Sequence, residues 1–154
     1  MESALNCERL VIRMRRYFYE VNYHHIDQNG DNHYFLIGYF SSLKSSKLAI
    51  ERVQDKPGFR DSGGCFEIDK FCVYFDNVIV EKSGLVLYEL SHEYLDSDGY
   101  DNFVVFGLYA TREQAEKVKE EKMKMYPYRK NPDGFLIAES KVDLCGWTEG
   151  FVNW

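Results

Sequence analysis

Apolar and polar residues alternate along the first part of the chain, and the same kind of segment returns later. Every second residue over 17–23 is Tyr or Val, and a polar turn at 27–32 then leads into an apolar run at 34–40. A second turn of the same type lies at 96–102 and precedes an apolar run at 103–109. A period of two predicts a half-buried strand, and a continuous apolar run predicts a strand covered on both faces. The pattern therefore predicts two β-hairpins.

One helix and one further strand are predicted after each hairpin. Thr111 and Gln114 have the spacing of a capping box, in which both side chains satisfy free backbone groups at the helix start. We expect this helix to run to about Met125, with Ala115, Val118 and Met125 facing inward. The earlier helix is expected at residues 43–54, and the closing strands at residues 65–73 and 134–142.

The two parts of the chain repeat each other. Residues 17–74 align with residues 86–143 at a constant offset of 69, and Gly38 falls on Gly107. The two glycines interrupt the apolar runs at the same place, which indicates a bulge or a close backbone approach. Internal repetition is considered before other sequence signals, because it indicates that one structural unit occurs more than once in the chain.

We predict an α+β fold made of two ββαβ repeats. Residues 17–80 form the first repeat, residues 85–154 form the second, and residues 1–16 form an extension, all within one compact body. A small sheet is marginal alone, so we expect the repeats to join into one mainly antiparallel sheet. Both helices would lie on one face of that sheet, related by a pseudo-twofold axis like the subunits of a homodimer.

The composition sets the class of protein. The chain has 154 residues, of which 45% are hydrophobic, and this is enough for a real core. No apolar stretch approaches the roughly 20 residues that cross a bilayer, and the first residues lack a signal-peptide pattern, so we expect a cytoplasmic protein without membrane contact. The four cysteines form no CxxC pair, and Cys65 and Cys72 would point to opposite faces of one strand. Reduced thiols fit this spacing better than a disulfide.

The net charge of −6 is spread unevenly. Residues 85–154 hold thirteen acidic residues against eight basic ones, so the second repeat is the acidic one. A phosphate backbone is bound by clustered Lys and Arg, so direct binding of nucleic acid is not expected. The acidity fits a basic protein partner, and it also fits a plain role in solubility.

Catalytic and metal-binding patterns are weak. His24 and His25 point to opposite faces of a strand, His92 stands alone, and no His-x-His pair is present. His25 and His33 can meet across the first hairpin. Glu20 and Glu89 hold equivalent strand positions, which suggests either paired carboxylates or an ordinary exposed face. We expect no cofactor, no metal ion and no catalytic residues, and therefore no enzyme.

The C-terminal tail, residues 147–154, is absent from the first repeat. It holds both tryptophans of the chain, with Glu149 between them. One reading is that Trp147 and Phe151 cover the core at the end of the sheet. The other is an aromatic anchor at a protein interface, where Trp is enriched.

A resemblance supports the repeat. The segments 88–94 and 106–116, the Pro132-Asp133-Gly134-Phe135 segment and the Trp-Thr-Glu-Gly-Phe tail resemble a family of small uncharacterised bacterial domains that end in such a tail. The second repeat matches over nearly its whole length, whereas the first lacks the tail. The resemblance implies the ββαβ unit and a bacterial origin, but no activity.

The leading functional hypothesis is a binding protein, an immunity or antitoxin-like inhibitor of a basic toxin enzyme. Acidic charge would speed association and aromatic anchors would supply affinity. The alternative is a small-molecule sensor or enzyme with a pocket between the repeats, and a third reading is a homo-oligomeric structural module. The chain itself would be a monomer or a homodimer. The predicted partner-binding residues are Asp96, Asp98, Tyr100, Asp101, Trp147, Glu149 and Trp154, and the predicted pocket residues are Tyr19, Tyr23, Tyr88 and His92.

Overall fold

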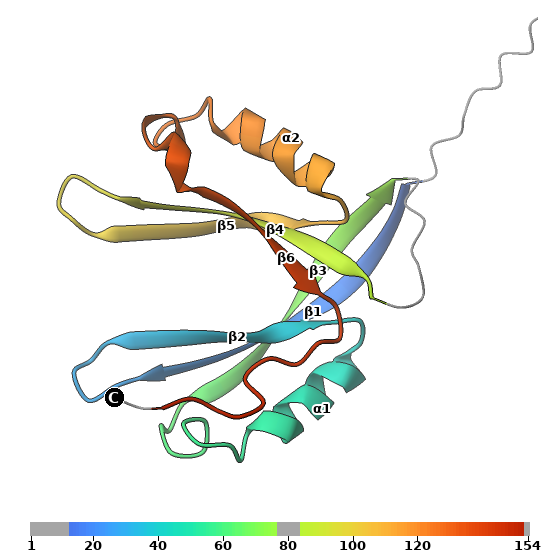
Figure 1. Cartoon of the computed structure of the whole chain (residues 1–154), viewed down its shortest axis with the longest axis vertical. Coiled ribbons are helices and arrows are strands. Elements are labelled where there is room, and N and C mark those ends of the chain that lie inside the picture. The colour runs from blue at the N-terminus through green and yellow to red at the C-terminus, as the bar shows by residue number, and fades with distance from the viewer. Residues whose placement is uncertain (1–12, 77–83, 153–154) are drawn as a thin grey trace, which may run out of the picture.

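Two halves of the chain form the same succession of elements. The computed structural model describes residues 13–76 and 84–152 (Figure 1). The first half contains β1 (Arg13–Ile26), β2 (Asn32–Phe40), α1 (Leu43–Val53) and β3 (Cys65–Asp76). The second half contains β4 (Val86–Leu95), β5 (Asp101–Tyr109), α2 (Arg112–Lys122), two short 3₁₀ turns, η1 (Tyr128–Lys130) and η2 (Pro132–Gly134), and β6 (Phe135–Lys141). The predicted α+β class and the order of elements are both present.

The strands form two separate antiparallel sheets of three strands each. The strand orders are β2-β1-β3 and β5-β4-β6. The prediction of one continuous sheet with both helices on one face is therefore wrong. Each helix packs on its own sheet, and the two helices lie on opposite outer sides of the molecule (Figure 1). The physical reason is that each sheet has a second apolar face, and packing the sheets face to face buries both.

The buried contact between the two sheets is a cluster of residues from both halves. Phe18 on β1 and Phe75 on β3 pack with Leu87 on β4 and Leu108 on β5, together with Tyr39, Val73 and Ala110. Phe18 and Leu87 are fully buried. We call the sheet surfaces that carry these residues the inner faces. A second cluster, which includes Val21, Tyr23 and Val53, lies between the first sheet and α1.

The strand registers of the two halves are equivalent. The β1–β2 register shifts between Val21 and Asn22, and the β4–β5 register shifts between Leu90 and Ser91, at the same offset as the sequence repeat. Gly38 and Gly107 lie opposite these shifts, with φ angles of 155° and 153°. The bulge expected from the two glycines is confirmed.

The turn and cap expectations hold in most details. Asp27 and Asp96 organise the hairpin turns, because each carboxylate accepts backbone N–H groups from residues two and four positions later. The Thr111 hydroxyl accepts from the Gln114 N–H at 3.2 Å, as predicted, but the Gln114 amide oxygen accepts from the Ala110 N–H at 3.0 Å. The predicted helix end is wrong, because α2 stops at Lys122 and Met125 lies beyond it, half exposed.

Some expectations fall on residues that the structure does not describe. Residues 1–12 of the predicted extension and residues 77–80 at the end of the predicted first repeat lie outside the described residues. Strand β1 begins at Arg13 and so includes the last residues of the predicted extension. No helix among residues 13–76 and 84–152 is long and apolar enough to cross a membrane.

The two bulge glycines supply a matched test of the fold. An added Cβ at Gly38 would stand 2.5 Å from the Leu144 carbonyl oxygen of the C-terminal segment, whereas at Gly107 the nearest atom is the Tyr109 hydroxyl at 3.3 Å. Gly107→Ala should cost roughly 1–3 kcal/mol through its positive φ alone. Gly38→Ala should cost clearly more in urea unfolding, because the C-terminal segment must also move. Equal losses for the two variants would contradict this placement of the segment.

Candidate functional site

The C-terminal segment of the second half crosses to the first half and completes its core. The Gly146 N–H donates to the Ile37 carbonyl at 2.7 Å, and the Trp147 ring N–H donates to the Leu36 carbonyl at 3.1 Å. Phe151 stacks on Phe35 with ring centroids 4.2 Å apart. The segment thus lies along the outer edge of β2 (Figure 1). The interpretation that the tail covers the core applies to Phe151. Trp147, in contrast, keeps 44% of its surface exposed.

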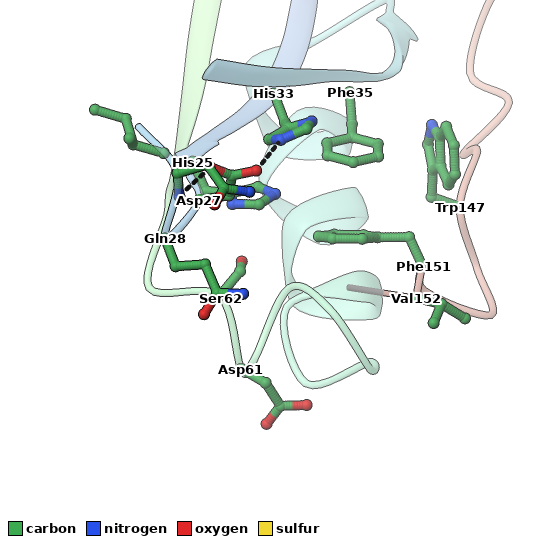
Figure 2. A pocket seen from close by; sticks show the side chains of 12 residues that line it. His25, Asp27, Gln28, His33, Phe35, Asp61, Ser62, Trp147, Phe151 and Val152 are labelled. Carbon is green, nitrogen blue, oxygen red and sulfur yellow. Dashed lines mark hydrogen bonds and ion pairs between the residues drawn. The ribbon is translucent and has the colours of Figure 1, made fainter. Parts of the chain in front are cut away.

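An open cavity of about 960 Å³ lies between the first hairpin and this segment (Figure 2). Its aromatic side consists of Phe35, Phe151 and Trp147, and its polar side includes His25 and His33. Asp27, Gln28, Asn29, Asp61 and Ser62 also line it, together with Ile26 and Val152. Aromatic walls beside a few converging polar groups are typical of small-molecule sites.

Two histidines and one carboxylate form the polar side of this cavity. His25 and His33 are register partners on β1 and β2, and their rings stack with centroids 5.0 Å apart. The expectation that they meet across the hairpin is confirmed. His33 Nε2 lies 3.0 Å from Asp27 Oδ2. That contact, followed by the backbone N–H of Asp31, lowers the pKa of the half-buried Asp27 carboxyl to about 2. The sequence did not indicate Asp27 as a cavity residue, because its position in a polar segment predicts a turn. The contact between its carboxylate and His33 is evident from the structure.

The four predicted pocket residues do not meet around a cavity. Tyr23 and His92 hold equivalent positions and are buried in the cores of different halves. The Tyr23 hydroxyl donates to the Phe59 carbonyl at 3.1 Å, and His92 Nε2 lies 2.7 Å from the Asn131 carbonyl. Neither these residues nor Tyr19 and Tyr88 line the cavity above or the second one described below.

The predicted partner-binding residues are split between two places. The turn residues Asp98, Tyr100 and Asp101 are exposed at the tip of the β4–β5 hairpin. Asp96 belongs to the same turn, but its carboxylate is occupied by the turn's own backbone N–H groups. Trp147 and Glu149 belong to the C-terminal segment, which is hydrogen-bonded to the first half at Leu36 and Pro57 and runs along it, away from that turn (Figure 1). Trp154 lies outside the described residues. The turn and the tail therefore do not form a single surface.

The inner faces carry large apolar side chains that remain exposed toward the hairpin turns. On the first sheet Tyr34 is 71% exposed, and on the second sheet Phe103 is 64% exposed. The register places Tyr34 beside His24, and Phe103 beside Glu93. We call this region the open inner faces, and its apolar members are Ile26, Tyr34, Leu36, Leu95, Phe103, Val105 and Leu136.

A polar group lies at the contact between the halves. The Tyr39 hydroxyl donates to a Glu89 carboxylate oxygen and also contacts Glu20, which accepts from the Asn22 amide. Glu20 and Glu89 therefore lie near one tyrosine hydroxyl. Glu20 is half-buried, so the expectation that it lies on an ordinary exposed face is not met. Burial is the main cause that raises the pKa of the Glu20 carboxyl, and the charge of Glu89 adds to it.

A second cavity, of about 470 Å³, lies beside α2. It is lined by Phe106 and Leu108 on β5, by Gln114 and Val118 on α2 and by Tyr74 on β3, together with Cys72, Asp76, Tyr109, Lys117 and Glu121. Ile37 and Ala49, which hold the positions equivalent to Phe106 and Val118, contact the C-terminal segment in the first half. The two halves therefore differ beside the helix. In the first half the C-terminal segment contacts these positions, whereas in the second half the equivalent positions line the second cavity.

Comparison with known proteins identifies no relative. No family model matches the chain, and no curated protein and no solved structure matches it significantly. The resemblance to small bacterial domains with a Trp-Thr-Glu-Gly-Phe tail stays a prediction.

The half-buried Glu20 supplies a test of pH dependence. A carboxyl with a raised pKa in the folded state adds stability while protonated, and this stability is lost as the pH rises above 4.5 and through the raised value. Glu20→Gln should therefore raise the thermal midpoint by a few degrees at pH 7 and change it little at pH 4.

The control for this measurement is Glu51→Gln, on the exposed side of α1. It should leave the midpoint unchanged at both values of pH. A Glu20→Gln variant that is less stable than the parent protein at pH 7 would contradict the assignment.

Proposed function

We propose that the protein is a non-catalytic binding module that recognises a basic protein through its open inner faces. The observation that carries the proposal is the exposure of large apolar residues on the facing surfaces of both sheets. Tyr34 and Phe103 are more than half exposed, although each lies within a hairpin strand, near the end that adjoins the turn. Contiguous exposed apolar surface on a soluble domain commonly marks an interaction site.

Acidic residues surround this apolar surface. Glu67 and Asp69 on β3, Glu93 on β4 and Asp101 on β5 are exposed, and the register places them on the inner faces. Together with the net charge of −6, they favour a partner with a positively charged surface. Aromatic side chains in the centre and charges at the rim are the usual arrangement of a specific interface.

The class of partner that we favour is a basic toxin enzyme, which makes this chain an immunity or antitoxin-like inhibitor. An inhibitor needs complementarity to its target and no chemistry of its own. Acidic complementarity accelerates the encounter, which matters for a protein that must capture an enzyme before the enzyme acts. The supporting features are the small size of the chain, the acidity and the exposed aromatic residues.

The experiment is a titration calorimetry measurement with the basic protein encoded by the neighbouring gene. Tyr34→Ala and Phe103→Ala should each weaken binding by at least about 30-fold, the effect of losing a hot-spot residue worth 2 kcal/mol. Binding should also weaken as the salt concentration rises, because opposite charges meet at the rim.

The matched control is Tyr126→Ala. The Tyr126 side chain is 67% exposed, close to the 71% of Tyr34 and the 64% of Phe103. It lies after α2 and away from the inner faces. It should bind like the parent protein. If no binding is detected, or if Tyr34→Ala and Phe103→Ala bind unchanged, the proposal fails.

A second candidate function rests on the cavity beside the first hairpin. Its aromatic side, its paired histidines and the Asp27 carboxylate suit a small planar or cationic ligand. This cavity lies between the first repeat and the tail of the second, and none of the four residues predicted to line a pocket between the repeats lines it. Screening small molecules by thermal shift tests this candidate, and a stabilising ligand should lose its effect in Phe35→Ala.

A further inference from the structure

Three potential metal ligands lie together on the inner face of the first sheet. His24 on β1 and Cys65 on β3 are direct partners in the strand register. Glu67 is two residues beyond Cys65, so its side chain is on the same face. Their ligand atoms all lie within 4.8 Å of one another. Among the residues that the structure describes, no other such group of three is found.

The distances fit a tetrahedral zinc site. His24 Nδ1 lies 3.5 Å from Cys65 Sγ and 3.7 Å from the nearer Glu67 carboxylate oxygen. With Zn–N bonds of about 2.0 Å and Zn–S bonds of about 2.3 Å, a tetrahedral ion holds its nitrogen and sulfur ligands roughly 3.5 Å apart. Cys65 Sγ is also 3.6 Å from His24 Nε2, so the imidazole must turn to aim one ring nitrogen at a bound ion.

The three ligands are specific to the first half. At the constant offset of the repeat, Glu93 replaces His24, Gly134 replaces Cys65 and Leu136 replaces Glu67. The second half builds the same strands with only one potential donor, Glu93, at these three positions, so the fold does not require the set. In addition, the His24 ring stacks on Tyr34 with centroids 5.7 Å apart, which orients the imidazole.

We propose that His24, Cys65 and Glu67 bind a Zn²⁺ ion. A thiolate and an imidazole favour zinc and similar transition metals, whereas Mg²⁺ and Ca²⁺ prefer oxygen ligands alone. Three protein ligands leave one position for water or for a donor from a bound molecule. Both Cys65 and Glu67 are exposed, so an ion reaches the site from solvent. This site adjoins the proposed binding surface, because it uses Glu67 and its His24 ring stacks on Tyr34, but metal binding goes beyond the recognition of a basic protein and is tested without a partner.

The test is a titration of the full-length, reduced protein with Co²⁺, whose spectrum reports the ligands directly. The parent protein should develop a thiolate-to-cobalt absorption band in the near ultraviolet and visible bands of tetrahedral cobalt, and Zn²⁺ should displace both. Cys65→Ser should lose the thiolate band. His24→Gln and Glu67→Gln should each weaken cobalt binding by at least about 100-fold, the upper end of what loss of even a supporting residue costs.

The matched control is Cys72→Ser, since Cys72 is also exposed and also on β3, but its side chain points to the other face. Cys7→Ser is the control for the N-terminal thiol. Both should keep the full spectrum, and circular dichroism should show that every variant is folded. The absence of a thiolate band in the parent protein, its persistence in Cys65→Ser or its loss in Cys72→Ser would overturn the proposal.

Discussion

The burial of the two inner faces against each other is the contact on which the rest of the structure depends. Phe18 and Phe75 from the first sheet meet Leu87 and Leu108 from the second. A three-stranded sheet with one helix is marginal by itself, so this contact supplies stability that neither half has alone. It also sets the limits of the exposed surface. Because the buried cluster occupies only one end of the inner faces, the other end, near the hairpin turns, stays open.

The C-terminal segment makes the two halves unequal. It completes the first half through Phe151 and the backbone of Gly146, and together with the first hairpin it forms an aromatic cavity. The two cavity histidines and the candidate zinc ligands also belong to the first half, whereas most of the excess negative charge belongs to the second. The two halves thus share one scaffold, and the residues that could bind a ligand or a metal ion lie where the halves differ.

Much of the local structure could be predicted from the sequence. Turn chemistry at Asp27 and Asp96, the bulge glycines and the Thr111 cap each act within a few residues, so the sequence pattern carries them. The arrangement of the sheets could not be predicted, because a period of two identifies the faces of a strand but not what covers each face. For the same reason, the meeting of His24 with Cys65 depends on the β1–β3 register, which joins residues far apart in the chain.

The central claim is that the two halves form one cooperative body joined through the inner faces. Native-state hydrogen exchange, measured for the amides of β1 and β4, tests it most directly. The account predicts that both strands exchange through the same global unfolding, and that Leu87→Ala, at the contact between the sheets, lowers the free energy of exchange equally in both. If β4 exchanges at a clearly lower free energy than β1, or if Leu87→Ala affects β4 alone, the halves are independent and the account is contradicted.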